Sequence, residues 1–161
     1  MSTGFDLRYL PLMTSSYFSG MSFTDRSRTI VRVLVIEDSA DDRELLMHQL
    51  RKHKIDAHVK FLEDGKEAFN FLSNLPPAAP FCDLIAIFLD LKLPSMSGLD
   101  LLRRIKKIPR VQNVPVIVMT ASLDPKDFEE CQCLKVAAFI PKPVTFVTFS
   151  KAITGLIHLP S

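Results

Sequence analysis

The chain has 161 residues, which is enough for one domain with a full core and too few for two ordinary domains. Its net charge is +2, and acidic and basic residues are interspersed, so the sequence shows no basic face for nucleic acid. No apolar run approaches the roughly 18 residues of a membrane span, and the first residues lack the basic and apolar regions of a signal peptide. We expect a soluble, cytoplasmic protein that binds neither nucleic acid nor a membrane.

The three cysteines, Cys82, Cys131 and Cys133, are odd in number and lack the spacing of metal ligands. This pattern favours buried or half-buried thiols in a reducing compartment.

Residues 1–28 are rich in serine, threonine, methionine and aromatic residues, and they show no sustained helical or strand period. The sequence predicts a flexible N-terminal extension over residues 1–28 and a single folded domain over residues 29–161. A transit peptide is an alternative for the first segment, because it holds scattered arginines and few acids.

Five segments have the character of β-strands. Residues 84–89 are apolar on both faces and end at Asp90, which is typical of a parallel strand covered by helices on each side. Residues 57–62 alternate instead, which is typical of an edge strand. The other three predicted strands are residues 30–36, 115–120 and 137–140.

A helix is predicted after each strand, and each shows an apolar stripe at helical spacing. Ser39 is a candidate N-cap for the first helix, and Asp124-Pro125 opens the fourth. The side chains expected to face inward are Leu45, Leu46 and Leu50 in the first helix; Ala68, Phe71, Leu72 and Leu75 in the second; Leu101, Leu102, Ile105 and Ile108 in the third; Phe128, Cys131 and Leu134 in the fourth; and Phe146, Phe149, Ile153, Leu156 and Ile157 in the fifth.

The alternation of strands and helices predicts a doubly wound α/β fold, because right-handed crossovers place helices on both faces of a parallel sheet. With the alternating segment at an edge, the five-stranded sheet takes the flavodoxin-like order 2-1-3-4-5. Its switch point lies between the first and third strands, where Glu37, Asp38 and Asp90 face one crevice.

Three converging carboxylates repel one another unless a cation lies between them, and Mg²⁺ prefers oxygen ligands of this kind. The alternative reading is structural: Glu37 and Asp38 complement a helix N-terminus, and Asp90 caps a turn. Thr120 and Lys142 end the fourth and fifth strands at the same rim. A lysine, a hydroxyl group and a metal together suit a bound phosphoryl group, although Lys142 is also explained as a counter-ion.

These features resemble the receiver domain of two-component response regulators over about residues 30–158. The resemblance rests on five ordered matches: Ile36-Glu37-Asp38, Leu89-Asp90-Leu91-Lys92-Leu93-Pro94 with Gly98 following, Thr120-Ala121, Phe139, and Lys142-Pro143.

The resemblance implies that Asp90 is the phosphoacceptor and that Mg²⁺ is held by Glu37, Asp38, Asp90 and the backbone carbonyl of Lys92. It implies that Lys142, Thr120 and the Ala121 amide contact the phosphoryl oxygens and that Thr120 and Phe139 form the conformational switch. It also implies a cis peptide bond between Lys142 and Pro143.

Two departures from the family concern the metal site: Glu37 is longer than the commoner aspartate, and Lys92 adds a cation beside the site. The helix predicted to end at Leu159 is followed only by Pro160-Ser161, so the chain resembles a single-domain receiver without an output domain. Some short receivers of this type serve phytochrome-type kinases.

The resemblance implies a signalling phosphoprotein rather than an enzyme, with a sensor histidine kinase or a histidine phosphotransfer protein as phosphodonor. It leaves open the downstream protein partner and a homodimer. One alternative is a phosphohydrolase of the haloacid-dehalogenase type, whose Asp-x-Asp signature would need an acid where Lys92 stands. Another is an interaction module that works without phosphate.

Overall fold

The computed structural model describes residues 31–76, 82–121 and 124–157, so the predicted extension at residues 1–28 lies outside the described residues. Five strands form one parallel sheet in the order β2-β1-β3-β4-β5. The predicted fold class, strand order and edge position of the second strand are therefore confirmed. The strands are β1 (Val31–Ile36), β2 (Val59–Leu62), β3 (Cys82–Asp90), β4 (Val116–Thr120) and β5 (Ala138–Pro141).

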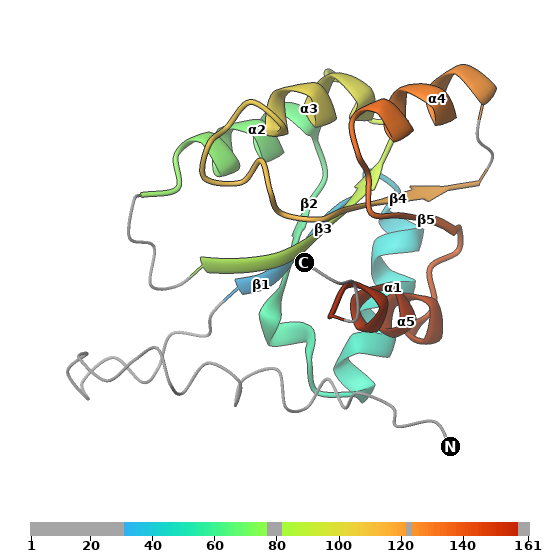
Figure 1. Ribbon diagram of the computed structural model, residues 1–161. Helices are drawn as coiled ribbons and strands as arrows, with labels where there is room; N and C mark the ends of the chain where they lie inside the picture. The colour runs from blue at the N-terminus through green and yellow to red at the C-terminus, as the bar shows by residue number, and fades with distance from the viewer. Residues whose placement is uncertain (1–30, 77–81, 122–123, 158–161) are drawn as a thin grey trace.

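Helices cover both faces of the sheet, as the doubly wound fold requires. Figure 1 shows α2, α3 and α4 on one face and α1 with α5 on the other. The helices are α1 (Ala40–Lys52), α2 (Gly65–Ser73), α3 (Gly98–Ile105), α4 (Pro125–Cys133) and α5 (Phe146–Ile157), and a 3₁₀ turn, η4 (Asp56–His58), precedes β2.

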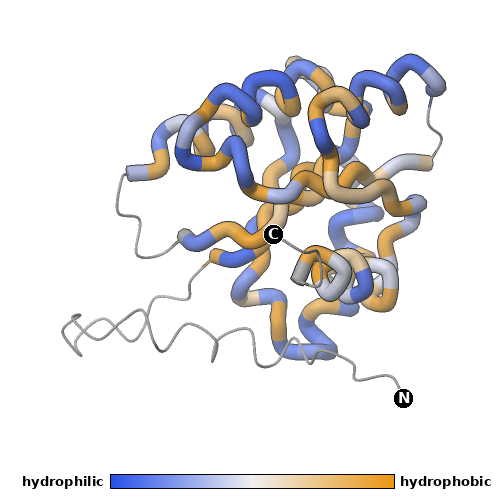
Figure 2. Tube along the Cα trace, in the orientation of Figure 1, coloured by the Kyte–Doolittle hydropathy of each residue, from blue (hydrophilic) through white to orange (hydrophobic). Residues whose placement is uncertain are grey.

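The central strands supply both halves of the core, because successive side chains of a strand point to opposite faces. In β3, Ala86 and Phe88 belong to the cluster under α1 and α5, whereas Ile87 and Leu89 belong to the cluster under α2 and α3. The strands are accordingly hydrophobic along most of their length in Figure 2, while the helices alternate between polar and apolar residues.

Four of the helices begin at a capping side chain, which fixes their first turns at the carboxyl edge of the sheet. A hydroxyl or carboxylate oxygen at an N-cap accepts backbone N–H groups that have no partner within the helix. The caps are Ser39 for α1, Asp64 for α2, Ser97 for α3 and Asp124 for α4. Ser39 and Asp124 hold the positions that the sequence predicts.

Three details of the predicted strands and helices are wrong. The strand predicted over residues 57–62 is shorter, because His58 donates to the Ile55 carbonyl in a 3₁₀ turn and β2 begins at Val59. Leu45 is 45% exposed and Phe128 is 37% exposed, although both were expected to face inward. In α1, Leu46 is buried against the sheet. Its neighbour Leu45 is rotated by about 100° around the helix axis and therefore faces away from the sheet.

The two cysteines whose side chains the structure describes differ in environment. Cys131 is buried, as expected, and burial raises the pKa of its thiol to about 11. Cys133 is exposed, which contradicts the expectation that it is at least half-buried. Neither forms a disulfide.

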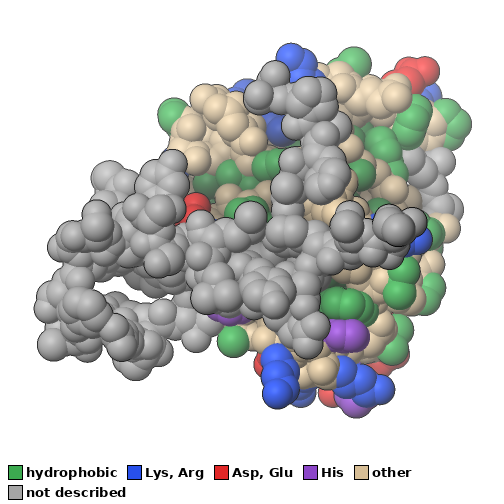
Figure 3. Space-filling model, turned by 60° about the horizontal axis from the view of Figure 1, so that its bottom comes forward, with side chains coloured by type: hydrophobic (Ala, Val, Ile, Leu, Met, Phe, Trp, Pro, Cys, Tyr) green, Lys and Arg blue, Asp and Glu red, His purple; other side chains and the backbone are tan. Residues whose placement is uncertain are grey.

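The C-terminal end of α1 is basic, and this end of the molecule comes forward in Figure 3. Arg51 and Lys52 lie in the last turn and His53 is the C-cap, where cations complement the helix dipole. Within residues 31–76, 82–121 and 124–157, no helix has the length and hydropathy needed to cross a membrane.

Candidate functional site

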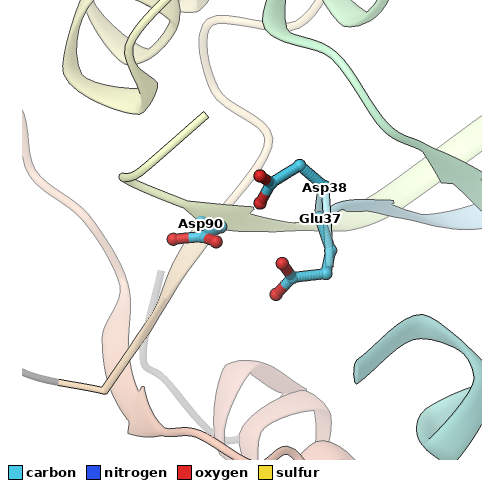
Figure 4. Close-up of side chains that lie close together, drawn as sticks. All are labelled: Glu37, Asp38 and Asp90. Carbon is cyan, nitrogen blue, oxygen red and sulfur yellow. The ribbon is translucent and has the colours of Figure 1, made fainter. Parts of the chain in front are cut away.

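Three carboxylates meet where β1 and β3 end. One oxygen from each of Glu37, Asp38 and Asp90 lies within 4.8 Å of the others, and Figure 4 shows the side chains converging from the two strand ends. Glu37 and Asp90 are only 3% and 5% exposed, whereas Asp38 is exposed. The order of the strands therefore brings together the three acids that the sequence singled out.

Both oxygens of the Glu37 carboxylate have hydrogen-bonding partners within the protein. Its Oε1 accepts the Ser39 backbone N–H at 3.0 Å, and its Oε2 pairs with the Lys142 Nζ at 2.7 Å. Burial raises the pKa of Glu37 from 4.5 to about 7, although the hydrogen bonds from Lys142 and Ser39 act in the opposite direction. Burial therefore keeps the pKa of this carboxyl group above its ordinary value even though both of its oxygens have hydrogen-bonding partners.

Lys142 is the central cation of the site. Besides Glu37, its Nζ lies 2.9 Å from Oδ2 of Asp90 and 3.4 Å from Oδ2 of Asp42. Burial lowers the pKa of Lys142, but the hydrogen bonds to Glu37 and Asp90 outweigh burial and raise it above its ordinary value. A single ammonium group thus balances several carboxylates. The Lys142-Pro143 peptide bond is cis, as predicted.

Asp38 differs from its two neighbours because it keeps its carboxylate available. Among the described residues, no ion pair or hydrogen bond to its side chain is present, although it lines the cleft beside Asp90. An exposed carboxylate next to two buried ones is a donor set that suits a hard, partly hydrated divalent cation. The three acids therefore fit Mg²⁺.

Asp90 is held at the start of a tightly packed turn. Its Oδ1 accepts the Lys92 N–H at 3.0 Å, and the Gly98 N–H donates to the Leu91 carbonyl at 2.9 Å. A Cβ on Gly98 would lie 2.3 Å from the Asp90 carbonyl oxygen, so only glycine lets α3 begin this close to the strand end. The carboxylate and the amide of Lys92 are consequently fixed relative to each other.

A cleft of about 480 Å³ opens over Asp90. The predicted site residues Lys92, Thr120, Ala121 and Lys142 all line it. The Lys142 N–H donates to the Thr120 carbonyl at 2.9 Å, which ties the end of β4 to the residue after β5. Side chains and backbone groups from the ends of β3, β4 and β5 therefore share one opening.

Phe139 lies outside this cleft lining. It is partly buried in β5, and its ring centre is 5.0 Å from that of Phe128 on α4. The predicted switch residue Phe139 therefore contacts α4, the helix whose first turn lines the cleft through Asp127.

Sequence reasoning missed three residues of the site. Asp42 reaches Lys142 from the first turn of α1, and Asp127 lines the cleft from the first turn of α4. Arg43 donates from Nη1 to the carbonyl oxygens of Glu37 and Asp38, at 2.9 and 2.8 Å. Acidic residues in the first turn of a helix are commonly explained by the helix dipole. Asp42 and Asp127 therefore could not be recognised as site residues from the sequence.

Comparison with known proteins decides the family. The family model for the response regulator receiver domain matches residues 33–154. The chain belongs to the response regulator receiver family. Receiver domains bind Mg²⁺ in an acidic active site. In this receiver, the acidic cluster lies at the ends of β1 and β3.

Individual relatives agree with this assignment. The receiver is 29% identical to the response regulator Rcp1 of Synechocystis over 133 residues, 83% of this chain and 90% of that protein. The bacteriophytochrome response regulator AtBRR is 33% identical, with a TM-score of 0.67 over 82% of this chain and 96% of that structure. The Mn²⁺-bound form of Rcp1 is 28% identical, with a TM-score of 0.63 over 81% of this chain and 99% of that structure.

Proposed function

We propose that this receiver accepts a phosphoryl group on Asp90 from a sensor histidine kinase or a histidine phosphotransfer protein, in a reaction that needs Mg²⁺ and takes place in the cytoplasm. One observation carries the proposal: a buried Asp90 carboxylate, 2.9 Å from Lys142, faces an open cleft in which Asp38 has no protein partner among the described residues. The carboxylate is therefore both accessible to a donor and surrounded by groups that balance negative charge.

Asp38, Asp90 and Glu37 are the side chains that would hold Mg²⁺, together with the backbone carbonyl of Lys92. Asp38 is the most available of them, whereas Glu37 is already bonded to Ser39 and Lys142 and would bind through water or after a change of partner. The bound metal would neutralise negative charge on the phosphoryl oxygens while the phosphoryl group is transferred.

In the transfer step, a carboxylate oxygen of Asp90 forms a bond to phosphorus while the nitrogen–phosphorus bond of the donor phosphohistidine breaks. The electron pair of that bond stays on the imidazole nitrogen, and the product is an acyl phosphate. Lys142 loses one carboxylate charge at Asp90 and gains phosphoryl oxygens at the same place, so its ion pair follows the transferred group.

Thr120 and Ala121 line the cleft on the side opposite Asp38, where a hydroxyl group and a backbone N–H would donate to phosphoryl oxygens. Movement of Thr120 toward those oxygens would change the space next to Phe139, its partner in the proposed switch. Phe139 touches Phe128, so α4 would report the change to a protein partner.

A phosphohydrolase of the haloacid-dehalogenase type is less well supported, because Lys92 occupies the position where that class needs an acid. An interaction module independent of phosphate would explain the fold but gives no reason for an open carboxylate beside a buried acid–lysine cluster.

Intact mass spectrometry after treatment with acetyl phosphate and Mg²⁺ tests the proposal. We expect the wild type to gain the mass of one phosphoryl group and Asp90→Asn to gain none, with near-native folding by circular dichroism. Asp56→Asn is a matched control, because Asp56 lies in η4 and not in the cleft lining, and its ion pair with Arg51 is long, at 3.9 Å. An undiminished mass gain in Asp90→Asn would overturn the assignment, and no gain in the wild type would favour the phosphate-independent module.

A further inference from the structure

The turn between β2 and α2, residues 62–65, contacts both segments that carry the candidate site. One segment is the acid loop, residues 37–39, which follows β1. The other is the acceptor loop, residues 91–97, which follows β3 and includes Lys92. None of the groups proposed to bind Mg²⁺ or the phosphoryl group comes from the β2–α2 turn.

The first set of contacts joins the turn to the acid loop through Arg43. Its guanidinium donates to the carbonyl oxygens of Glu37 and Asp38, and its Nη2 lies 2.9 Å from Oε1 of Glu63 in the turn. The Arg43 side chain is only 15% exposed, so this planar group is fixed by three acceptors at once. The Glu37 N–H also donates to the Leu62 carbonyl at 3.0 Å.

The second contact joins the turn to the acceptor loop through Asp64. Its Oδ1 accepts the N–H groups of Lys66 and Glu67, at 2.7 and 3.2 Å, and thereby caps α2. Its Oδ2 accepts a hydrogen bond from the Ser95 hydroxyl. Ser95 has a φ of 54°, a left-handed conformation that a residue other than glycine adopts only when its surroundings hold it there.

The third contact is steric. A Cβ added to Gly65 would lie 2.6 Å from the Met96 carbonyl oxygen and 3.0 Å from the Met96 Cβ. The φ of Gly65 is not in the left-handed region, so its backbone would accept alanine and only the closeness of the acceptor loop requires glycine. The turn and the acceptor loop are therefore packed backbone against backbone.

We propose that the β2–α2 turn is a positioning element for the metal site: Glu63, Asp64 and Gly65 set the separation between the acid loop and the acceptor loop, and with it the affinity for the divalent cation. This inference rests on the proposed function, because it assigns a role toward the cation held between those loops. Neighbouring residues of one turn bind one loop each, so a shift of the turn changes the distance between the acids and the Lys92 carbonyl. Residues that orient metal ligands without binding the metal themselves typically reduce metal affinity by about 10- to 100-fold when they are removed.

Gly65→Ala is the main test, with Gly155→Ala as its matched control. Both substitutions add one Cβ to a helical glycine, but nothing lies within 4 Å of the Cβ position at Gly155 on α5. We expect Gly65→Ala to weaken Mn²⁺ binding, measured by electron paramagnetic resonance, by about tenfold. We expect Gly155→Ala to bind Mn²⁺ as the wild type does.

Ser95 provides the second test. Ser95→Ala removes the hydroxyl that reaches Asp64, and we expect weaker Mn²⁺ binding together with faster hydrogen exchange of the Lys92 and Gly98 amides in the metal-free protein. Ser95→Asn should restore both, because asparagine tolerates a left-handed φ and its amide group can donate to Asp64. Ile105→Val, which shortens a buried side chain of α3 away from these loops, controls for a general loss of stability.

The outcomes separate this inference from the proposed function. If the wild type binds Mn²⁺ and labels at Asp90 while Gly65→Ala and Ser95→Ala bind the metal equally well, the positioning role is overturned and the function stands. If Ile105→Val weakens Mn²⁺ binding as much as Gly65→Ala does, the effect is one of stability and the positioning role is again overturned. A wild type that does not bind the metal overturns both.

Discussion

The sheet holds α5 and α4 in different ways. Phe149 of α5 is 1% exposed and stacks on Phe88 with 4.7 Å between ring centres, and the Phe146 N–H donates to Gln49 of α1 at 2.6 Å. In α4 the buried residue is Cys131, while Phe128 remains 37% exposed.

The difference indicates which part of the receiver can respond to chemistry at Asp90. Helix α5 is fixed by aromatic packing in the core, whereas the first turn of α4 contributes Asp127 to the wall of the cleft. An ion pair between Arg103 and Glu130 links α4 to α3, and exposed pairs of this kind add little stability. A change of charge in the cleft should therefore displace α4 before it displaces α5.

The largest expected effect comes from replacing a phenylalanine by alanine on each of the two helices, Phe149 on α5 and Phe128 on α4. Phe149→Ala should lower the free energy of unfolding by about 3–5 kcal/mol, because it leaves a cavity against Phe88. Phe128→Ala should lower it by less than about 1 kcal/mol, because the ring is already partly solvated. Urea denaturation followed by circular dichroism measures both values. Similar losses in the two variants would contradict the contrast between the helices.

The cleft, to which α4 contributes Asp127, should respond to pH. Because the folded protein raises the pKa of Glu37 from 4.5 to about 7, the folded state binds more protons than the unfolded state between these values. The contribution of Glu37 to the stability of the metal-free protein should therefore decrease as pH rises from 4.5 to 7. Metal binding competes with that proton, so Mg²⁺ affinity should fall by up to about tenfold per pH unit below 7.

Calorimetric titration of Mg²⁺ at pH 6, 7 and 8, in buffers of different ionisation enthalpy, measures both the affinity and the proton released. Glu37→Gln serves as the comparison, since it carries no titrating carboxyl group. A pH dependence that persists unchanged in Glu37→Gln would assign the proton to another group.

A smaller effect is expected from Thr120→Ala, which keeps Asp90 and its partners in place. The variant should still be phosphorylated, but amide hydrogen exchange over residues 124–157 should no longer change when a phosphoryl mimic is added. In the wild type we expect the change to be concentrated in α4 rather than α5. An equal response in the two proteins would remove Thr120 from the switch, and no response in either would favour a passive module.

The smallest effect is expected from deleting residues 1–28, the predicted flexible extension. Since that segment shows no amphipathic period, its removal should leave the melting temperature and the labelling of Asp90 almost unchanged. Thermal denaturation and intact mass spectrometry of the shortened chain measure this. A large drop in melting temperature would mean that the extension packs on the domain.

The sequence predicts most of the sheet because apolar runs such as residues 84–89 have only one stable place, between two layers of helices. Its predictions are weaker on the helix surfaces. The apolar stripe of α1 includes Leu45, but spacing alone does not define how wide a stripe the sheet covers. For the same reason the spacing places Phe128 in the core, although its ring is partly exposed and packs beside Phe139.

The site was predictable where strand ends carry its residues and unpredictable where helices and turns do. Glu37, Asp38 and Asp90 follow directly from strand order, because parallel strands end at one edge of the sheet. Arg43 and Asp42 come from the first turns of α1, and their direction depends on how that helix leans over the strand ends. No periodic pattern in the sequence encodes that angle.

The order of the strands also has a consequence for assembly, because β2 and β5 form the two borders of the sheet. Each border strand has only four residues, and β5 ends at Pro141, which has no N–H to offer to an added strand. On β2, Lys60 places a charge over the Phe71 ring at 5.2 Å. Neither border is suited to backbone pairing with another chain, so recognition of this receiver should proceed through side chains on its helices and loops, and its monomers should resist joining edge to edge.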